Sequence, residues 1–119
     1  MSKRETIIYI AGKYSAETRD EISLNIHKAF LTAQAIWSLG YFAFCPHKNT
    51  EHFEELVPSL THEDYIVGDI AMLERCDAIF MVDGWKESNG AIREHARAEQ
   101  LGIQIFYDIE DLRRWNGGN

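Results

Sequence analysis

Four short, nearly continuous hydrophobic runs stand out along the chain and predict β-strands. They are Thr6–Ala11, Tyr41–Cys45, Asp77–Val82 and Ile103–Tyr107. The first is β-branched and aromatic with no polar alternation, a pattern typical of a strand buried on both faces in the middle of a parallel sheet.

Helical spacing of apolar residues fills most of the chain between these runs. The predicted helices are Ile22–Ile36 with Gly40 as its C-cap, Thr61–Arg75, Ser88–Gln100, and a short Asp108–Trp115. The stretch 47–60 has no clean period and contains Pro58, so it is expected to be an irregular loop with one short helix.

Alternation of strands and helices predicts the architecture. We expect one α/β domain over residues 1–119: a doubly wound sheet of four or five mainly parallel strands, with helices on both faces. Ligands of such sheets bind beyond the carboxyl ends of the strands. The candidate loops are therefore 12–15, 46–50 and 83–90.

The loop 83–90 leads from a strand into a helix. Ser88 is a natural N-cap, and Gly90 allows another group to approach the backbone closely. Free amides and the positive end of a helix dipole suit a phosphate or carboxylate, although the same residues also fit an ordinary helix cap. Trp85 could stack on a base, or belong to the core.

Polar residues in the other two loops could also contact a ligand. Lys13 and Ser15 follow Gly12 and could hold an anion, but the segment lacks the spacing of a Walker loop. His47 follows Pro46 and is placed to donate a hydrogen bond into a pocket.

Two carboxylates border apolar helix faces. Glu94 falls in the stripe of Ala91, Ala98 and Leu101 that should pack on the sheet, where burial of an acid costs free energy unless it is paired or used. Alternatively, Glu94 points outward and pairs with Arg93 or Arg97.

Asp69 lies beside the apolar face of the preceding helix and could reach the same crevice or remain in water. A pair of carboxylates about 5 Å apart is the geometry of retaining glycosidic cleavage. Tyr9, in the middle of the first strand, could direct its hydroxyl into the site or serve as an ordinary core tyrosine.

Composition narrows the classes of ligand. There are 12 Lys and Arg against 19 Asp and Glu, giving a net charge of −7, which argues against binding of polymeric nucleic acid but permits a small phosphorylated ligand. Cys45 and Cys76 do not form a metal or disulfide pattern, and His47, His52, His62 and His95 lack ligand spacing, so no metal site is expected. The absence of a leader or a long apolar stretch predicts a cytoplasmic protein without membrane contact.

Several motifs together resemble the nucleoside 2-deoxyribosyltransferase superfamily, whose fold is Rossmann-like. The motifs, in chain order, are Ile8-Tyr9-Ile10-Ala11-Gly12 with Tyr14-Ser15, Pro46-His47, Asp69-Ile70-Ala71-Met72-Leu73, Cys76-Asp77-Ala78, and Gly84-Trp85-x-x-Ser88-x-Gly90-Ala91-x-x-Glu94. The resemblance implies that Glu94 attacks the anomeric carbon, that Asp69 assists proton transfer to the base, and that Tyr9 orients the nucleophile.

The residue six positions before the glutamate distinguishes two branches of that superfamily. In the transferases that act on free nucleosides this residue is an aspartate, whereas in the 5′-monophosphate N-glycosidases it is a serine. This chain has Ser88 at that position and so resembles the second branch. Lys13 departs from the proline usual in relatives. The resemblance implies a cofactor-free hydrolase of a (2′-deoxy)nucleoside 5′-monophosphate, forming a homodimer or larger oligomer through the apolar first helix. The alternatives are a base-exchanging 2-deoxyribosyltransferase and a non-catalytic nucleotide sensor.

Overall fold

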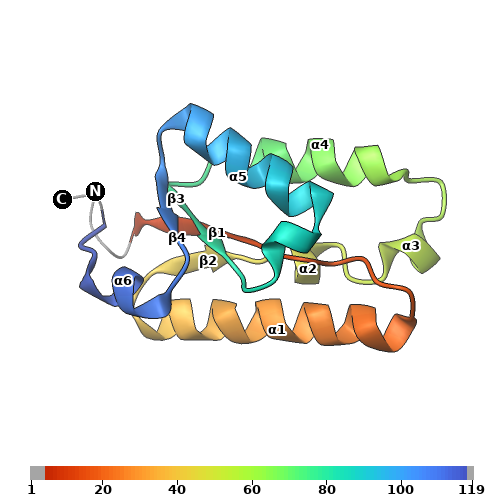
Figure 1. Cartoon of the computed structure of the whole chain (residues 1–119), viewed down its shortest axis with the longest axis horizontal. Helices are drawn as coiled ribbons and strands as arrows, with labels where there is room; N and C mark the ends of the chain where they lie inside the picture. Colours follow the sequence, from red (N-terminus) through yellow and green to blue (C-terminus); the bar gives the residue numbers. More distant parts are fainter. Residues whose placement is uncertain (1–4, 118–119) are drawn as a thin grey trace.

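Four parallel strands form one sheet between two layers of helices in the computed structural model, which describes residues 5–117 (Figure 1). The strands are β1 (Ile7–Ala11), β2 (Phe42–Phe44), β3 (Ala78–Met81) and β4 (Gln104–Phe106). The helices are α1 (Arg19–Ser38), α2 (Pro46–Asn49), α3 (Phe53–Leu56), α4 (His62–Leu73), the 3-10 helix η2 (Trp85–Glu87), α5 (Asn89–Leu101) and α6 (Ile109–Arg114). The predicted α/β class and parallel sheet are confirmed.

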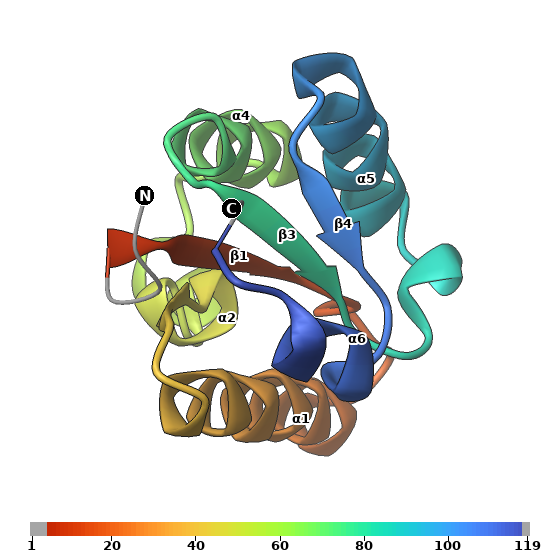
Figure 2. The same cartoon turned by 90° about the vertical axis from the view of Figure 1, so that its left-hand side faces the viewer.

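The strand order β2-β1-β3-β4 places β1 and β3 at the centre of the sheet. Tyr9 of β1 lies opposite Phe44 of β2 on one side and Ile79 of β3 on the other. The connections leaving β1 and β3 diverge, because α1 covers one face of the sheet and α5 the other (Figure 2). This divergence opens a crevice at the carboxyl ends of the two central strands.

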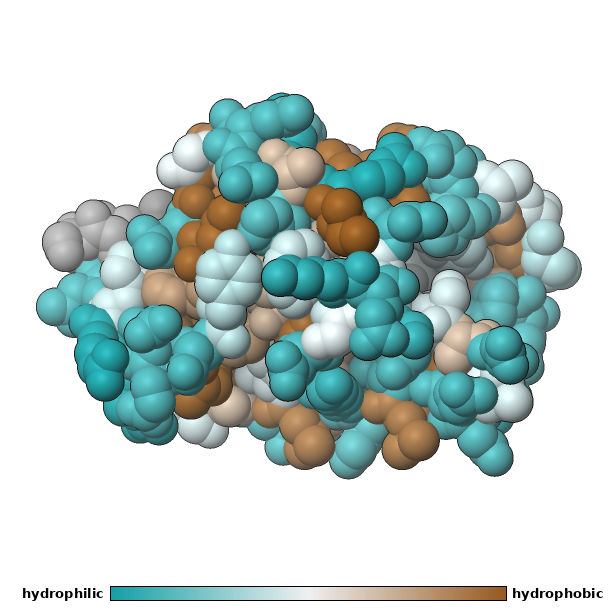
Figure 3. Space-filling model, viewed as in Figure 1, coloured by the Kyte–Doolittle hydropathy of each residue, from teal (hydrophilic) through white to brown (hydrophobic). Residues whose placement is uncertain are grey.

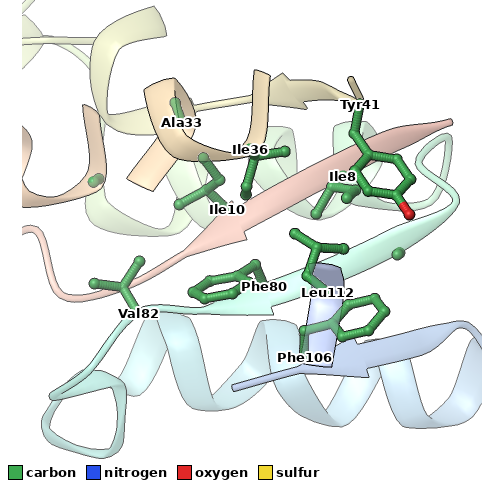
Figure 4. Packing of buried hydrophobic residues seen from close by; sticks show 11 residues of the cluster. Ile8, Ile10, Ala33, Ile36, Tyr41, Phe80, Val82, Phe106 and Leu112 are labelled. Carbon is green, nitrogen blue, oxygen red and sulfur yellow. The ribbon is translucent and has the colours of Figure 1, made fainter. Parts of the chain in front are cut away.

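Alternation along β1 divides the hydrophobic core into two clusters. Ile8 and Ile10 belong to the cluster that packs against α1 and α6, shown in Figure 4. Tyr9 and Ala11 belong to the cluster on the opposite face, together with residues of α4 and α5. The period of two in a strand therefore directs the Tyr9 hydroxyl toward the layer that contains Glu94.

The segment 46–60 differs from the expected loop with one short helix. It contains two short helices, α2 and α3. Pro46 is the first residue of α2, and His52, with a positive φ of 60°, immediately precedes α3. Proline is pre-organised for the first turn of a helix, and a residue in the left-handed conformation cannot lie inside one, so the two helices stay separate.

Helix α1 carries hydrophobic side chains on its solvent face. Figure 3 shows brown atoms along the lower edge of the molecule, over α1, where Leu24 is 67% and Leu31 50% exposed. The contact face that we expect for an oligomer thus stays a prediction. None of the helices in the described part of the chain has the length and apolar character needed to cross a membrane.

Candidate active site

A cavity of about 320 Å³ lies beyond the carboxyl ends of the central strands, on the side of α4 and α5. It is lined by residues of the three candidate loops, 12–15, 46–50 and 83–90, and of the helices α4 and α5. The predicted site residues that line it are Gly12, Ser15, His47, Asp69, Ser88, Gly90 and Glu94.

Glu94 points into the protein, with 5% of its surface exposed. It lies between Ala91 and Ala98 on the face of α5 that packs on the sheet, and the hydroxyl of Tyr9 donates a hydrogen bond to its Oε2. Tyr9 is itself fully buried behind Glu94 and does not line the cavity. The hydrogen bond fixes one carboxylate oxygen.

The two arginines considered as outward partners of Glu94 are engaged elsewhere. Arg93 pairs with Glu63, with 2.9 Å between Nη1 and Oε1, and Arg97 pairs with Glu74, with 2.7 Å between Nη2 and Oε2. The alternative of an outward-facing Glu94 is therefore wrong.

Burial changes the protonation of both carboxylates. It raises the pKa of Glu94 to about 8; the hydrogen bond from Tyr9 opposes this shift and the charge of Asp69 adds to it. Burial also raises the pKa of Asp69 to about 6. Between these values the pair holds about one proton, as reactions that need one acid and one attacking carboxylate require.

Helix α5 begins at the cavity wall. The Ser88 Oγ accepts a hydrogen bond of 3.2 Å from the Ala91 amide, and the Ser88 carbonyl accepts one of 2.9 Å from Ile92. The amides of Asn89 and Gly90 have no acceptor within the helix, as is general for a first turn. These amides and the helix dipole favour an anion at this wall of the cavity.

Gly90 also brings α5 against α4. A Cβ at position 90 would lie 2.7 Å from Cδ1 of Ile66, closer than side chains tolerate. Any larger residue at position 90 would displace the end of the Ile66 side chain, so glycine permits the close packing of the helix that carries Glu94 on the helix that carries Asp69.

The first loop approaches the site through its backbone. A Cβ at Gly12 would lie 2.9 Å from Cβ of Val82, so glycine permits the loop to cross the end of β3. His47 is buried, its Nε2 lies 3.1 Å from the Lys13 carbonyl, and burial lowers the pKa of its imidazole. A neutral His47 donating to that carbonyl ties the first and second loops together.

Comparison with known proteins matches residues 6–107 to DUF4406, a domain of unknown function. The chain belongs to the DUF4406 family. No curated protein matches its sequence.

The DUF4406 chain is also similar to a solved structure of a 2-deoxyribosyltransferase from the psychrotolerant bacterium Bacillus psychrosaccharolyticus. The two are 17% identical, the similarity covers 93% of each chain, and the TM-score is 0.65. This likeness confirms the expected 2-deoxyribosyltransferase-like fold.

Two of the predicted ligand contacts lie outside the cavity of the DUF4406 chain. The Lys13 ammonium is 3.6 Å from the Glu87 carboxylate and borders a separate hollow of about 180 Å³. Trp85 stacks on His95, with 4.5 Å between ring centroids, next to Tyr107, and does not line the cavity. The structure thus gives both residues partners within the protein instead of bringing them to Glu94.

Further polar side chains line the cavity without having been predicted as site residues. They are Tyr14, Thr50, Glu54, His62 and Tyr65. Tyr65 precedes Asp69 by four positions, a spacing that places both on one face of α4 and could have signalled it. Glu54 gave no such signal, because its position depends on the irregular path of residues 46–60.

Among residues 5–117, no group of three or more His, Cys, Asp or Glu side chains is arranged to hold a metal ion.

Proposed function

We propose that this DUF4406 domain hydrolyses the N-glycosidic bond of a 2′-deoxynucleoside 5′-monophosphate, releasing the base and the sugar 5-phosphate. One observation carries the proposal. Glu94, a buried carboxylate hydrogen-bonded by Tyr9, shares a cavity with a second carboxylate, Asp69, and with the anion-favouring start of α5 at Ser88.

The substrate phosphate would rest on Ser88 and the free first-turn amides of α5, which donate hydrogen bonds to an anion. Gly12 and Ser15 border the same space. This placement leaves the anomeric carbon near Glu94 and the base near Asp69.

In the first step, a Glu94 oxygen forms a bond to C1′ as the bond from C1′ to the base nitrogen breaks. Asp69 gives its proton to the departing base, which leaves neutral. In the second step, water attacks C1′, Asp69 takes the proton of that water, and Glu94 is released as a carboxylate. Tyr9 donates to Glu94 throughout and holds the attacking group in place.

Between pH of about 6 and about 8 the pair carries one proton, which the two pKa values place mainly on Glu94. The active form is the minor arrangement, with the proton on Asp69 and Glu94 ionised, and its population is greatest in the same interval of pH. Because the pKa values are about 6 and about 8, we expect a bell-shaped pH profile of kcat/KM with limbs near these values. Asp69→Asn should lower kcat about 100-fold or more and abolish the alkaline limb, since no acid remains to be deprotonated.

In the same variant the pKa of Glu94 should fall, because the charge of Asp69 no longer raises it. Its residual activity should therefore increase with pH to a plateau. If the pH profile of kcat/KM for Asp69→Asn kept both limbs of the wild-type profile, Asp69 would not be the acid.

Tyr9→Phe tests the orientation of the nucleophile. Loss of the hydrogen bond that lowers the pKa of Glu94 should raise that pKa, depopulate the ionised form, and move the alkaline limb upward. We expect kcat/KM at pH 7 to fall about 10-fold with little change in KM. A pH profile identical to the wild type would show that Tyr9 only packs the core.

The solved structure of a 2-deoxyribosyltransferase supports a second candidate, base exchange. The same glycosyl intermediate would then be resolved by a second base instead of water. Incubation of a deoxynucleoside with a different free base should form a new nucleoside in that case.

The decisive experiment is chromatography of deoxynucleoside and ribonucleoside 5′-monophosphates after incubation with the wild type. Base and sugar phosphate are the expected products. Tight binding of a monophosphate without release of base from any of them would replace the proposal with the non-catalytic sensor.

A further inference from the structure

A cluster of polar side chains lies at the outer end of the cavity, on residues outside the catalytic machinery. We define the outer polar cluster as Tyr14, Glu54 and Tyr65, all of which line the cavity. The Tyr14 hydroxyl donates to Glu54 Oε1 at 2.7 Å and accepts from the His52 amide at 2.9 Å. Tyr14 thereby holds the Glu54 carboxylate at the cavity.

The cluster has unused hydrogen-bonding capacity. The Tyr65 hydroxyl is shielded from solvent and has no partner among the described residues. Glu54 accepts from Tyr14, and its two oxygens offer further lone pairs. Since a shielded hydroxyl without a partner is unfavourable, a ligand that supplies the missing partner gains affinity.

The position of the cluster relative to Asp69 identifies the part of a substrate that it meets. Tyr65 and Asp69 lie four residues apart on α4, so one helical turn separates them on the same face. In the proposed reaction the base departs beside Asp69. The edge of a purine remote from the sugar then reaches Tyr65 and faces Glu54.

Resting on the proposed function, we infer that the outer polar cluster selects guanine as the base. Guanine presents the acceptor O6 next to two donors, N1–H and the 2-amino group. The Tyr65 hydroxyl can donate to O6, and the Glu54 carboxylate accepts from both donors. Adenine would instead place the lone pair of N1, and thymine that of O2, against a carboxylate.

The test compares base release from deoxyguanosine monophosphate, its inosine analogue and thymidine monophosphate by the wild type. The inosine analogue lacks the 2-amino group and keeps O6 and N1–H. We expect kcat/KM for the guanine substrate to exceed that for the inosine analogue about 10-fold and that for thymidine monophosphate about 100-fold. The first factor is modest because the Glu54 side chain is 38% exposed.

Glu54→Gln should remove the difference between guanine and inosine substrates, because the amide retains one acceptor oxygen for Tyr14 and replaces the other with a donor. Glu55→Gln is the matched control. It makes the same change of charge on the neighbouring residue, which pairs with Arg19 and does not line the cavity, so the base preference should persist.

Tyr65→Phe deletes the hydroxyl alone. It should lower kcat/KM several-fold for the two substrates that carry O6 and leave the 2-aminopurine nucleotide, which lacks O6, unaffected.

Binding of the three nucleotides to Glu94→Gln by calorimetry separates the two proposals. Release of all bases at equal rates would overturn the inference and leave the hydrolase intact. If the wild type releases no base but Glu94→Gln binds the guanine nucleotide most tightly, the proposed reaction is wrong and the guanine selectivity stands. If Glu94→Gln binds the three nucleotides equally, the inference of guanine selectivity is wrong.

Discussion

Glu94→Gln is expected to reduce base release at least about 1000-fold and, at the same time, to stabilise the fold at alkaline pH. The loss of activity follows from the chemistry, because an amide cannot form the bond to C1′ that the proposed first step requires. Gln keeps the shape of the side chain and one acceptor oxygen for Tyr9, so the cavity should be preserved.

The gain in stability follows from the raised pKa of Glu94. With a folded-state pKa of about 8 and an ordinary value of 4.5, the folded protein binds the proton more tightly than the unfolded chain does. Wild-type stability should therefore fall as pH rises from about 5 to about 8, whereas the neutral Gln has no such cost. The difference at pH 8 is expected to be a few kcal/mol.

Denaturant unfolding of both proteins at pH 5 and pH 8 measures this effect. Glu17→Gln is a suitable control, since that residue is exposed and does not line the cavity, so it should leave the pH dependence unchanged. Full activity in Glu94→Gln would remove Glu94 as the nucleophile, whatever the stability shows.

Ser88→Asp should raise KM for a nucleoside 5′-monophosphate about 100-fold. Aspartate caps a helix as well as serine does, so α5 should still begin at Asn89. Its negative charge would repel the phosphate at the position where the first-turn amides otherwise attract it. KM for the corresponding nucleoside, which has no phosphate, should change little.

Ser88→Asn is the matched control, because asparagine has the size of aspartate, caps equally well and is neutral. Steady-state kinetics on both substrate forms with the two variants isolate the effect of charge. An equal loss in Asp and Asn variants would indicate steric blockage, and no loss in either would place the phosphate elsewhere.

Local patterns predicted part of the structure on which these experiments depend. The buried run around Tyr9 predicts a central strand and Ser88 predicts the start of α5. The stripe through Glu94 leaves two alternatives, an inward carboxylate and an outward one, and the structure has the inward one. Each depends on a repeat of two or 3.6 residues or on a capping side chain, which a short window of sequence contains.

Other features depend on contacts between distant segments. Whether Asp69 and Glu94 share a cavity is decided by the packing of α4 on α5, and whether Glu54 reaches it is decided by the path of residues 46–60. Lys13 and Trp85 illustrate the reverse case, since Glu87 and His95 engage them away from the cavity. No periodicity within one segment contains this information.

The close approach at Gly90 has a consequence for how new specificities could arise. Because the backbone of one helix rests on a side chain of the other there, the separation of the two acids is set by regular structure and not by surface loops. The segment 50–60 could then be exchanged for others of different chemistry while bond cleavage continues. Such a protein is suited to engineering of new substrate specificities, because the two acids on α4 and α5 can be kept while the segment 50–60 is replaced.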